Sequence, residues 1–125
     1  MLRNLLIVGL GGFAGSILRY LVAGLNLRID LFSVPVGTLL VNITGSYFIG
    51  LLTGISEKSE VLSAEWRLFL MVGICGGFTT FSSFTNENLI LMQNGQTATV
   101  LLYTLLSIFL GFAAVYSGFI TTNLF

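Results

Sequence analysis

The sequence predicts an all-α membrane protein with four transmembrane helices. Of its 125 residues, 55% are hydrophobic and only 8% are charged, whereas soluble domains carry about 25% charged residues. The mean hydropathy is +0.99. Apolar stretches of the roughly 20 residues needed to cross a bilayer are separated by short polar connections. We therefore expect one four-span domain over residues 1–125, embedded in the cell membrane and in contact with the lipid bilayer.

The first span is expected at residues 2–25, with Arg3 near one end and Arg19 towards the other. Its apolar stretch runs past the length of a signal peptide without a clear polar stop, so we interpret it as a retained span. A short polar connection leads to Pro35, which suits the first turn of a helix. The second span is expected at residues 36–55.

The third and fourth spans are expected at residues 66–92 and 97–120. The most polar stretch of the chain, residues 56–60, precedes the third span and predicts a loop. Trp66 marks a membrane interface, where amphipathic rings prefer to lie. A polar turn around Gly95 separates the last two spans.

Composition excludes several classes of function. The chain has no histidine and one cysteine, which excludes a His/Cys metal site, an intrachain disulfide and most histidine-based catalysis. Five basic and five acidic residues cancel, which argues against a nucleic-acid partner. We expect the protein not to be an enzyme.

The positive charges are almost balanced across the membrane. With four spans, the N-terminus, the central loop and the C-terminus share one side, which carries Arg3, Lys58 and Arg67, while Arg19 and Arg28 lie towards the other. Because Lys/Arg asymmetry sets orientation, such a chain could insert both ways and form an antiparallel homodimer. A weak bias also occurs in proteins with one fixed orientation, so charge alone leaves both alternatives open.

Small residues recur at close-packing spacing on three of the predicted helices. Such pairs let helix backbones approach closely inside a membrane. Packing within one subunit and packing within an oligomer both explain them. The pairs are Gly11 with Gly15, Gly50 with Gly54, Ser107 with Gly111, and Ala114 with Gly118.

The stretch from Gly73 to Asn88 is an unusually polar interruption of an apolar helix. Two adjacent glycines, Gly76 and Gly77, cost about 1 kcal/mol each in a helix interior and permit unusual backbone angles. They predict a broken third helix. Carbonyls freed there could coordinate a hard cation such as Na⁺; the alternative is a kink healed by serine and threonine side chains.

Aromatic and hydroxyl side chains follow the glycine pair with a period of three. Phe78, Phe81 and Phe84 form one ridge, and threonine and serine form another beside it. Lipid contact or packing is the ordinary role of such rings. The positive edge of a ring can also meet an anion, and such weak binding suits a pore because it permits exit.

Two further polar side chains lie within spans. Thr38, Asn42 and Gly45 share one helix face, and the Asn42 amide suits either an interhelical hydrogen bond or donation to a permeating anion. Arg19 either extends to the headgroups or raises the anion concentration at a vestibule.

Glu87 is the only carboxylate well inside a span. It suits an acid group at a pore end, the coupling site of a proton-driven transporter, or an interface residue. In the fourth span, Tyr103, Thr104 and Ser107 share a face and predict a hydroxyl track.

Three segments together resemble the Fluc family of fluoride channels, also called CrcB: residues 11–20, 37–46 and 76–84. Length and helix count agree as well, and the fourth span matches only in character. The resemblance implies a dual-topology antiparallel homodimer with two fluoride pores along the subunit interface. It also implies passive efflux of fluoride from the cytoplasm.

The resemblance further implies roles for individual residues. Phe81 and Phe84 would form an aromatic box built by both subunits, Asn42 would face the pore, and Arg19 would belong to the aqueous vestibule. The backbone carbonyls of Gly76 and Thr79 would hold a structural, non-transported Na⁺ on the dimer axis. The hydroxyl lining would comprise Thr80, Ser83, Tyr103 and Ser107.

Two competing functions are weighed against this one. Four-helix exporters of the small multidrug resistance family are also dual-topology, but they depend on a carboxylate in the first span, and this chain has none before Asp30. A membrane scaffold without transport would leave the concentration of phenylalanine, hydroxyl and amide side chains unexplained.

Overall fold

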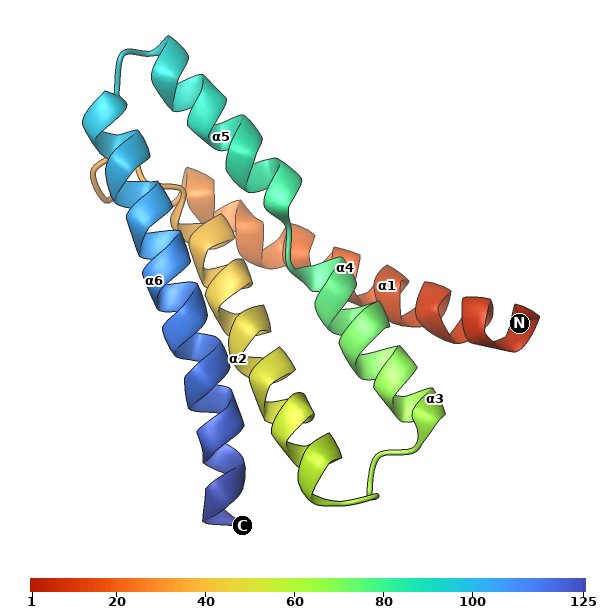
Figure 1. Ribbon diagram of the computed structural model, residues 1–125. Coiled ribbons are helices and arrows are strands. Elements are labelled where there is room, and N and C mark those ends of the chain that lie inside the picture. Colours follow the sequence, from red (N-terminus) through yellow and green to blue (C-terminus); the bar gives the residue numbers. More distant parts are fainter.

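The computed structural model describes residues 1–125 and is helical almost throughout (Figure 1). The prediction of an all-helical chain with four spans is confirmed. Each of four helical segments is long and apolar enough to cross a membrane: Leu2–Leu27, Val36–Lys58, Ala64–Gln93 and Thr97–Leu124.

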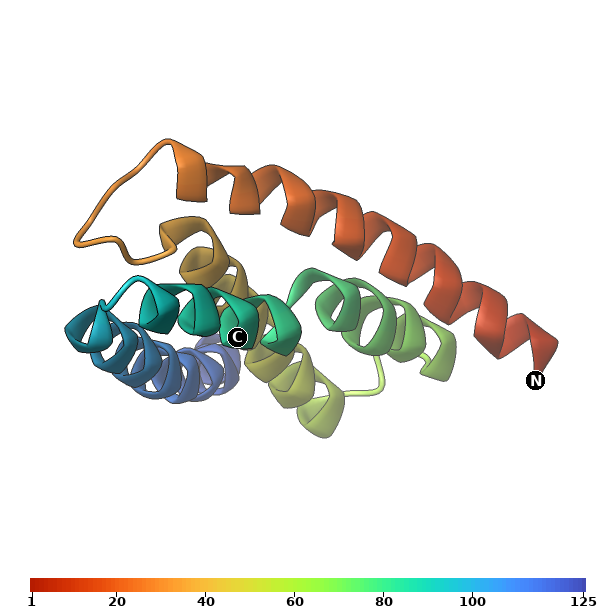
Figure 2. The same cartoon turned by 90° about the horizontal axis from the view of Figure 1, so that it is seen from above.

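The first span consists of α1 (Leu2–Ala23) and a short 3-10 turn, η1 (Gly24–Leu27). A connection of irregular backbone follows, and α2 (Val36–Lys58) begins directly after Pro35, whose fixed φ suits this position. Figure 2 shows α1 lying beside the first part of the third span, which it contacts at residues 68–78.

The third span contains four helical pieces. A single turn, α3 (Ala64–Arg67), leads into a π-helical stretch, η2 (Leu68–Cys75), and then into α4 (Gly76–Phe78). The chain resumes as α5 (Phe81–Gln93). Widened π turns are frequently found at functional sites.

Between α4 and α5, the backbone leaves the helical conformation at Thr79 (φ −76°, ψ 155°) and Thr80 (φ −150°, ψ 124°). Gly76 and Gly77, where we expected the interruption, are helical. Two contacts stabilise this departure: the Thr80 side chain caps α5 by accepting from the Ser83 N–H, and a side chain of α2 meets the backbone of Thr80.

The fourth span, α6 (Thr97–Thr121) with the terminal turn η3 (Thr122–Leu124), packs most extensively against α2. Two glycines explain how closely these helices approach. A Cβ at Gly50 would overlap the Val115 carbonyl, and one at Gly118 would overlap the Tyr47 carbonyl. These small residues therefore serve packing within one chain.

The other small residues divide between buried and open positions. Gly11 and Gly15 are buried against η2, where a Cβ would meet the carbonyls of Phe69 and Ile74. Gly111 differs, because nothing lies within 4 Å of a Cβ built there.

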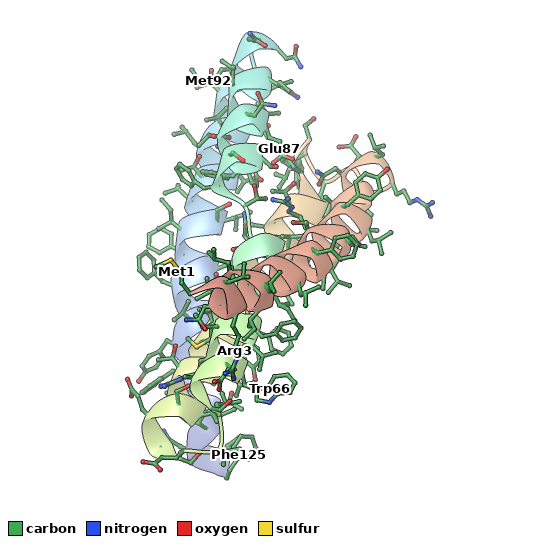
Figure 3. All side chains as sticks on the ribbon, turned by 90° about the vertical axis from the view of Figure 1, so that its right-hand side faces the viewer. Met1, Arg3, Trp66, Glu87, Met92 and Phe125 are labelled. Carbon is green, nitrogen blue, oxygen red and sulfur yellow. The ribbon has the colours of Figure 1, made fainter.

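At one end of the molecule, polar side chains join segments that are far apart in the sequence. There, Arg3 pairs with Glu65 at 2.7 Å, and Lys58 hydrogen-bonds Asn123. Figure 3 shows Arg3, Trp66 and Phe125 towards this end and Glu87 towards the other. The N-terminus, the central connection and the C-terminus therefore share one side, as four spans require.

Little of the chain is buried within itself. Only 17 of 125 residues are buried, and large apolar side chains are exposed along all four spans. The small core contains Val34, Leu91 and Tyr103. The remaining apolar surface must meet lipid or another protein chain.

Candidate functional site

Asn42 on α2 binds both polar groups of one residue in the non-helical segment. Its Nδ2 donates to the Thr80 carbonyl at 3.0 Å, and the Thr80 N–H donates to its Oδ1 at 2.8 Å. This pairing satisfies backbone groups that would otherwise be unpaired within a membrane. It also orients the side-chain amide, which keeps one N–H free for another acceptor.

Two carbonyls lose their ordinary helical partners at the same place. In a continuous α-helix, the N–H of Thr80 would bond the Gly76 carbonyl, and the N–H of Ser83 would bond the Thr79 carbonyl. The Thr80 N–H instead donates to α2, and the Ser83 N–H donates to the Thr80 Oγ1 at 3.2 Å. The carbonyls of Gly76 and Thr79 are therefore free to accept from other groups.

A groove of about 420 Å³ lies beside this segment, between α2, the third span and α6. Phe81, at its edge, is 76% exposed. The groove brings together most of the residues that the sequence singled out: Asn42, Gly76, Thr79, Thr80, Phe81, Phe84 and Ser107.

Ser107 contributes a polar atom without a partner. Its Oγ is buried and makes no hydrogen bond, although buried hydroxyls almost always have one. Ser107 lines the groove, so a rotation of its hydroxyl, which has no partner within the chain, would present it to a bound ion or to water.

Glu87 lies one turn beyond Phe84 on α5 and is held by donors from three other segments. Its Oε2 accepts from Thr38 Oγ1 at 2.7 Å and from Asn26 Nδ2 at 3.1 Å, and its Oε1 accepts from Tyr103 Oη at 2.8 Å. No basic residue pairs with it. The carboxylate is thus a common acceptor for η1, α2 and α6.

Four of the predicted site residues lie outside the groove lining: Arg19, Ser83, Glu87 and Tyr103. Tyr103 is fully buried; its hydroxyl bonds Glu87 and its ring packs edge-on against Phe84, with centroids 5.0 Å apart. Ser83 is half-buried, and Arg19 is half-buried on α1. The predicted hydroxyl track therefore reaches the groove only at Ser107.

Sequence reasoning missed several contributors. Ser46 lines the groove, and its position four residues after Asn42 could have indicated this, because residues at that spacing share a helix face. Asn26 was assigned to a polar connection, but it bonds both Thr38 and Glu87. No local pattern predicts that contact, since it depends on how three spans pack.

The side chains offer no conventional metal site, because no group of three or more His, Cys, Asp or Glu residues lies together. The carbonyls of Gly76 and Thr79 are oxygen donors of the kind that hard cations prefer. Such a cation takes about six oxygens, so this chain supplies part of a set that other oxygens would complete. The residues present fit a carbonyl-held cation.

Comparison with known proteins settles the family. Residues 6–119 match the profile described as CrcB-like protein, Camphor Resistance (CrcB). The chain belongs to the CrcB family. Proteins similar to this CrcB-family chain include the fluoride-specific ion channel FluC of Azobacteroides pseudotrichonymphae, 45% identical over the whole of both chains.

Two further relatives carry the same name. The FluC of Methanococcus maripaludis is 41% identical over 99% of each chain. That of Flavobacterium psychrophilum is 40% identical over 95% of this chain and 96% of its own. The similarity to these CrcB-family proteins therefore extends over all four spans.

Proposed function

We propose that this chain forms a fluoride-specific ion channel. The observation that carries the proposal is the groove in which the Asn42 amide, two phenyl rings and the unpartnered Ser107 hydroxyl meet beside the non-helical segment. The fluoride-specific channels named among its relatives support the choice of ion.

The proposed channel selects fluoride by replacing its water with several modest donors. The free N–H of Asn42 and the hydroxyls of Thr80 and Ser107 donate to the anion, and the edges of Phe81 and Phe84 add a weak attraction. None of these groups is a fixed cation that would trap the ion. Arg19 acts at the vestibule, where its charge raises the local anion concentration.

Tyr103 and Ser83 do not line the groove, but they hold residues that do. Tyr103 is fully buried, and its contact with Phe84 supports a role in holding that ring. Ser83 bonds the Thr80 hydroxyl and helps to hold the non-helical segment. Glu87 holds Tyr103 in turn, because it accepts a hydrogen bond from the Tyr103 hydroxyl.

The functional unit of this proposal is a dual-topology, antiparallel homodimer with a broken third helix in each subunit. The groove is open on one side, and Phe81 at its edge is largely exposed. A second copy in the opposite orientation would complete the wall of each pore. The nearly balanced positive charges of the chain support insertion in both orientations.

The carbonyls of Gly76 and Thr79 are the proposed holders of a structural Na⁺ between the subunits. Their loss of helical partners supports this assignment. The bound ion would add positive potential near the pores. Exchanging Na⁺ for N-methyl-D-glucamine during purification is expected to lower the thermal midpoint, and an unchanged midpoint would count against the site.

The proposed physiological role is passive efflux. Fluoride enters from an acidic medium as HF, ionises in the cytoplasm and needs a route out. Liposomes containing the protein and loaded with KF should release fluoride to an ion-selective electrode when K⁺ is allowed to leave. An intact, reconstituted protein that releases no fluoride would overturn the proposal.

Proton-coupled transport through Glu87 is the second candidate, because side chains from three other helical segments converge on this carboxylate. The two candidates are separated by fluoride flux measured with a protonophore present. A channel conducts without a pH gradient, and Glu87→Gln retains measurable flux. Strict dependence on both the gradient and the carboxylate would favour the transporter.

A further inference from the structure

The connection between η1 and α2 exposes an unusual amount of apolar surface for a loop. Leu27 is 95% exposed, Phe32 is 82% exposed and Leu31 is 56% exposed. The two spans that it joins end at Leu27 and begin at Val36. The connection therefore lies at a surface of the membrane, where its apolar side chains can reach lipid.

The backbone of this connection is strained. Phe32 (φ 56°) and Ser33 (φ 66°) are the only non-glycine residues with positive φ in the chain. Left-handed backbone at a residue with a large side chain is energetically costly and persists only where neighbouring contacts impose it.

Hydrogen bonds to polar groups impose this conformation. The Ser33 N–H donates to the Asp30 Oδ1 at 3.0 Å, and Thr99 Oγ1 donates to the Phe32 carbonyl at 3.1 Å. Gln96 Nε2 donates to the Ser33 Oγ at 2.9 Å. The polar groups of the connection thus face the start of α6, and the Phe32 ring is left exposed.

We infer that residues 27–32 form a lipid anchor whose apolar side chains insert at the boundary between headgroups and acyl chains. The aromatic ring of Phe32 and the aliphatic side chains of Leu27 and Leu31 suit the acyl side of that boundary. Arg28, which is exposed beside them, suits lipid phosphate. The flanking spans end at Leu27 and begin at Val36, which puts these side chains at the level of the headgroup boundary and favours lipid over a second copy of the chain as their occupant.

The anchor is tested by placing a fluorescent reporter in it. Trp66 is the single tryptophan, so Trp66→Phe provides a silent background for Phe32→Trp. The full-length protein is reconstituted in phosphatidylcholine carrying bromine near the top or near the end of the acyl chains, and acrylamide serves as the aqueous quencher. The control reporter is Glu60→Trp in the same background, because Glu60 is exposed in the most polar connection.

We expect Phe32→Trp to be quenched several-fold more by shallow bromine than by deep bromine, with less acrylamide quenching than the control reporter. Quenching like that of Glu60→Trp would place the residue in water, and protection from both quenchers would place it in a protein contact; either overturns the anchor. Circular dichroism and size-exclusion elution verify folding. Leu27→Trp repeats the measurement where Phe32→Trp does not fold. The outcome does not depend on which ion the protein conducts.

Discussion

At the scale of single residues, Asn42 has two tasks that depend on one orientation of its amide. The two hydrogen bonds to Thr80 point one N–H and the carbonyl oxygen at the backbone. Because the amide is planar, these two hydrogen bonds also fix the direction of its second N–H, which is the proposed anion donor. Anion binding by Asn42 therefore depends on its support of the backbone. A substitution at this position affects both tasks at once.

Asn42→Asp should abolish most fluoride flux and destabilise the protein. The carboxylate can still accept from the Thr80 N–H, but it cannot donate to the Thr80 carbonyl and it repels an anion. One lost hydrogen bond of this kind costs about 0.6 to 2 kcal/mol within a membrane. Fluoride efflux from liposomes and the thermal midpoint in detergent measure the two effects.

The matched control is Thr44→Val, two residues away on α2 and outside the lining of the groove. It is expected to leave fluoride efflux close to that of the parent. Equal loss of flux in both variants would show that α2 is merely intolerant of change, and normal flux in Asn42→Asp would exclude the proposed donor.

At the scale of helices, the pairing of α2 with α6 depends on glycines that bring the two backbones into contact. Gly118→Ala should destabilise the fold by about 1–3 kcal/mol, because the added methyl overlaps the Tyr47 carbonyl. Thermal unfolding followed by circular dichroism measures the loss.

Gly111→Ala is the comparison on the same helix. Nothing lies within 4 Å of a Cβ at this position, and alanine is favoured over glycine in a helix by about 1 kcal/mol. Its thermal midpoint should equal or exceed that of the parent. A larger loss at Gly111 than at Gly118 would contradict the packing described here.

The third span has features that its sequence predicts and features that depend on how the helices pack. Apolar length predicted the four spans, because it is a local property, whereas the glycine pair that was expected to interrupt the helix is helical. The backbone leaves the helical conformation at Thr79 and Thr80 instead. The Thr80 side chain that caps α5 is a local signal, but the amide of Asn42 comes from α2 and depends on packing. The burial of Tyr103 against Glu87 likewise follows from packing, which hydroxyl periodicity alone did not reveal.

At the scale of the whole molecule, orientation depends on very few charges. Gln93→Arg with Asn94→Arg adds two positive charges at one end, and Ser59→Arg with Glu60→Arg adds two at the other. Each double variant should insert predominantly one way. In a dual-topology dimer, either variant alone should lose most fluoride efflux from cells, and co-expression of the two should restore it.

A fluoride electrode compares efflux from cells that express either double variant alone with efflux from cells that express both. Full flux from one variant and none from the other, without rescue, would indicate a single fixed orientation. Labelling of a cysteine introduced at Val61, which is 80% exposed and unchanged in both double variants, reports the orientation directly, since the native Cys75 is buried.

The pairing of Asn42 with Thr80 also has a consequence for biogenesis. An extended segment exposed to hydrocarbon would leave several backbone groups without partners, each costing several kcal/mol. We therefore expect the span over Ala64–Gln93 to enter the bilayer as an uninterrupted helix and to open only after α2 has docked beside it. The non-helical segment would then form late in assembly, and a nascent chain that stalls before docking should hold no pore.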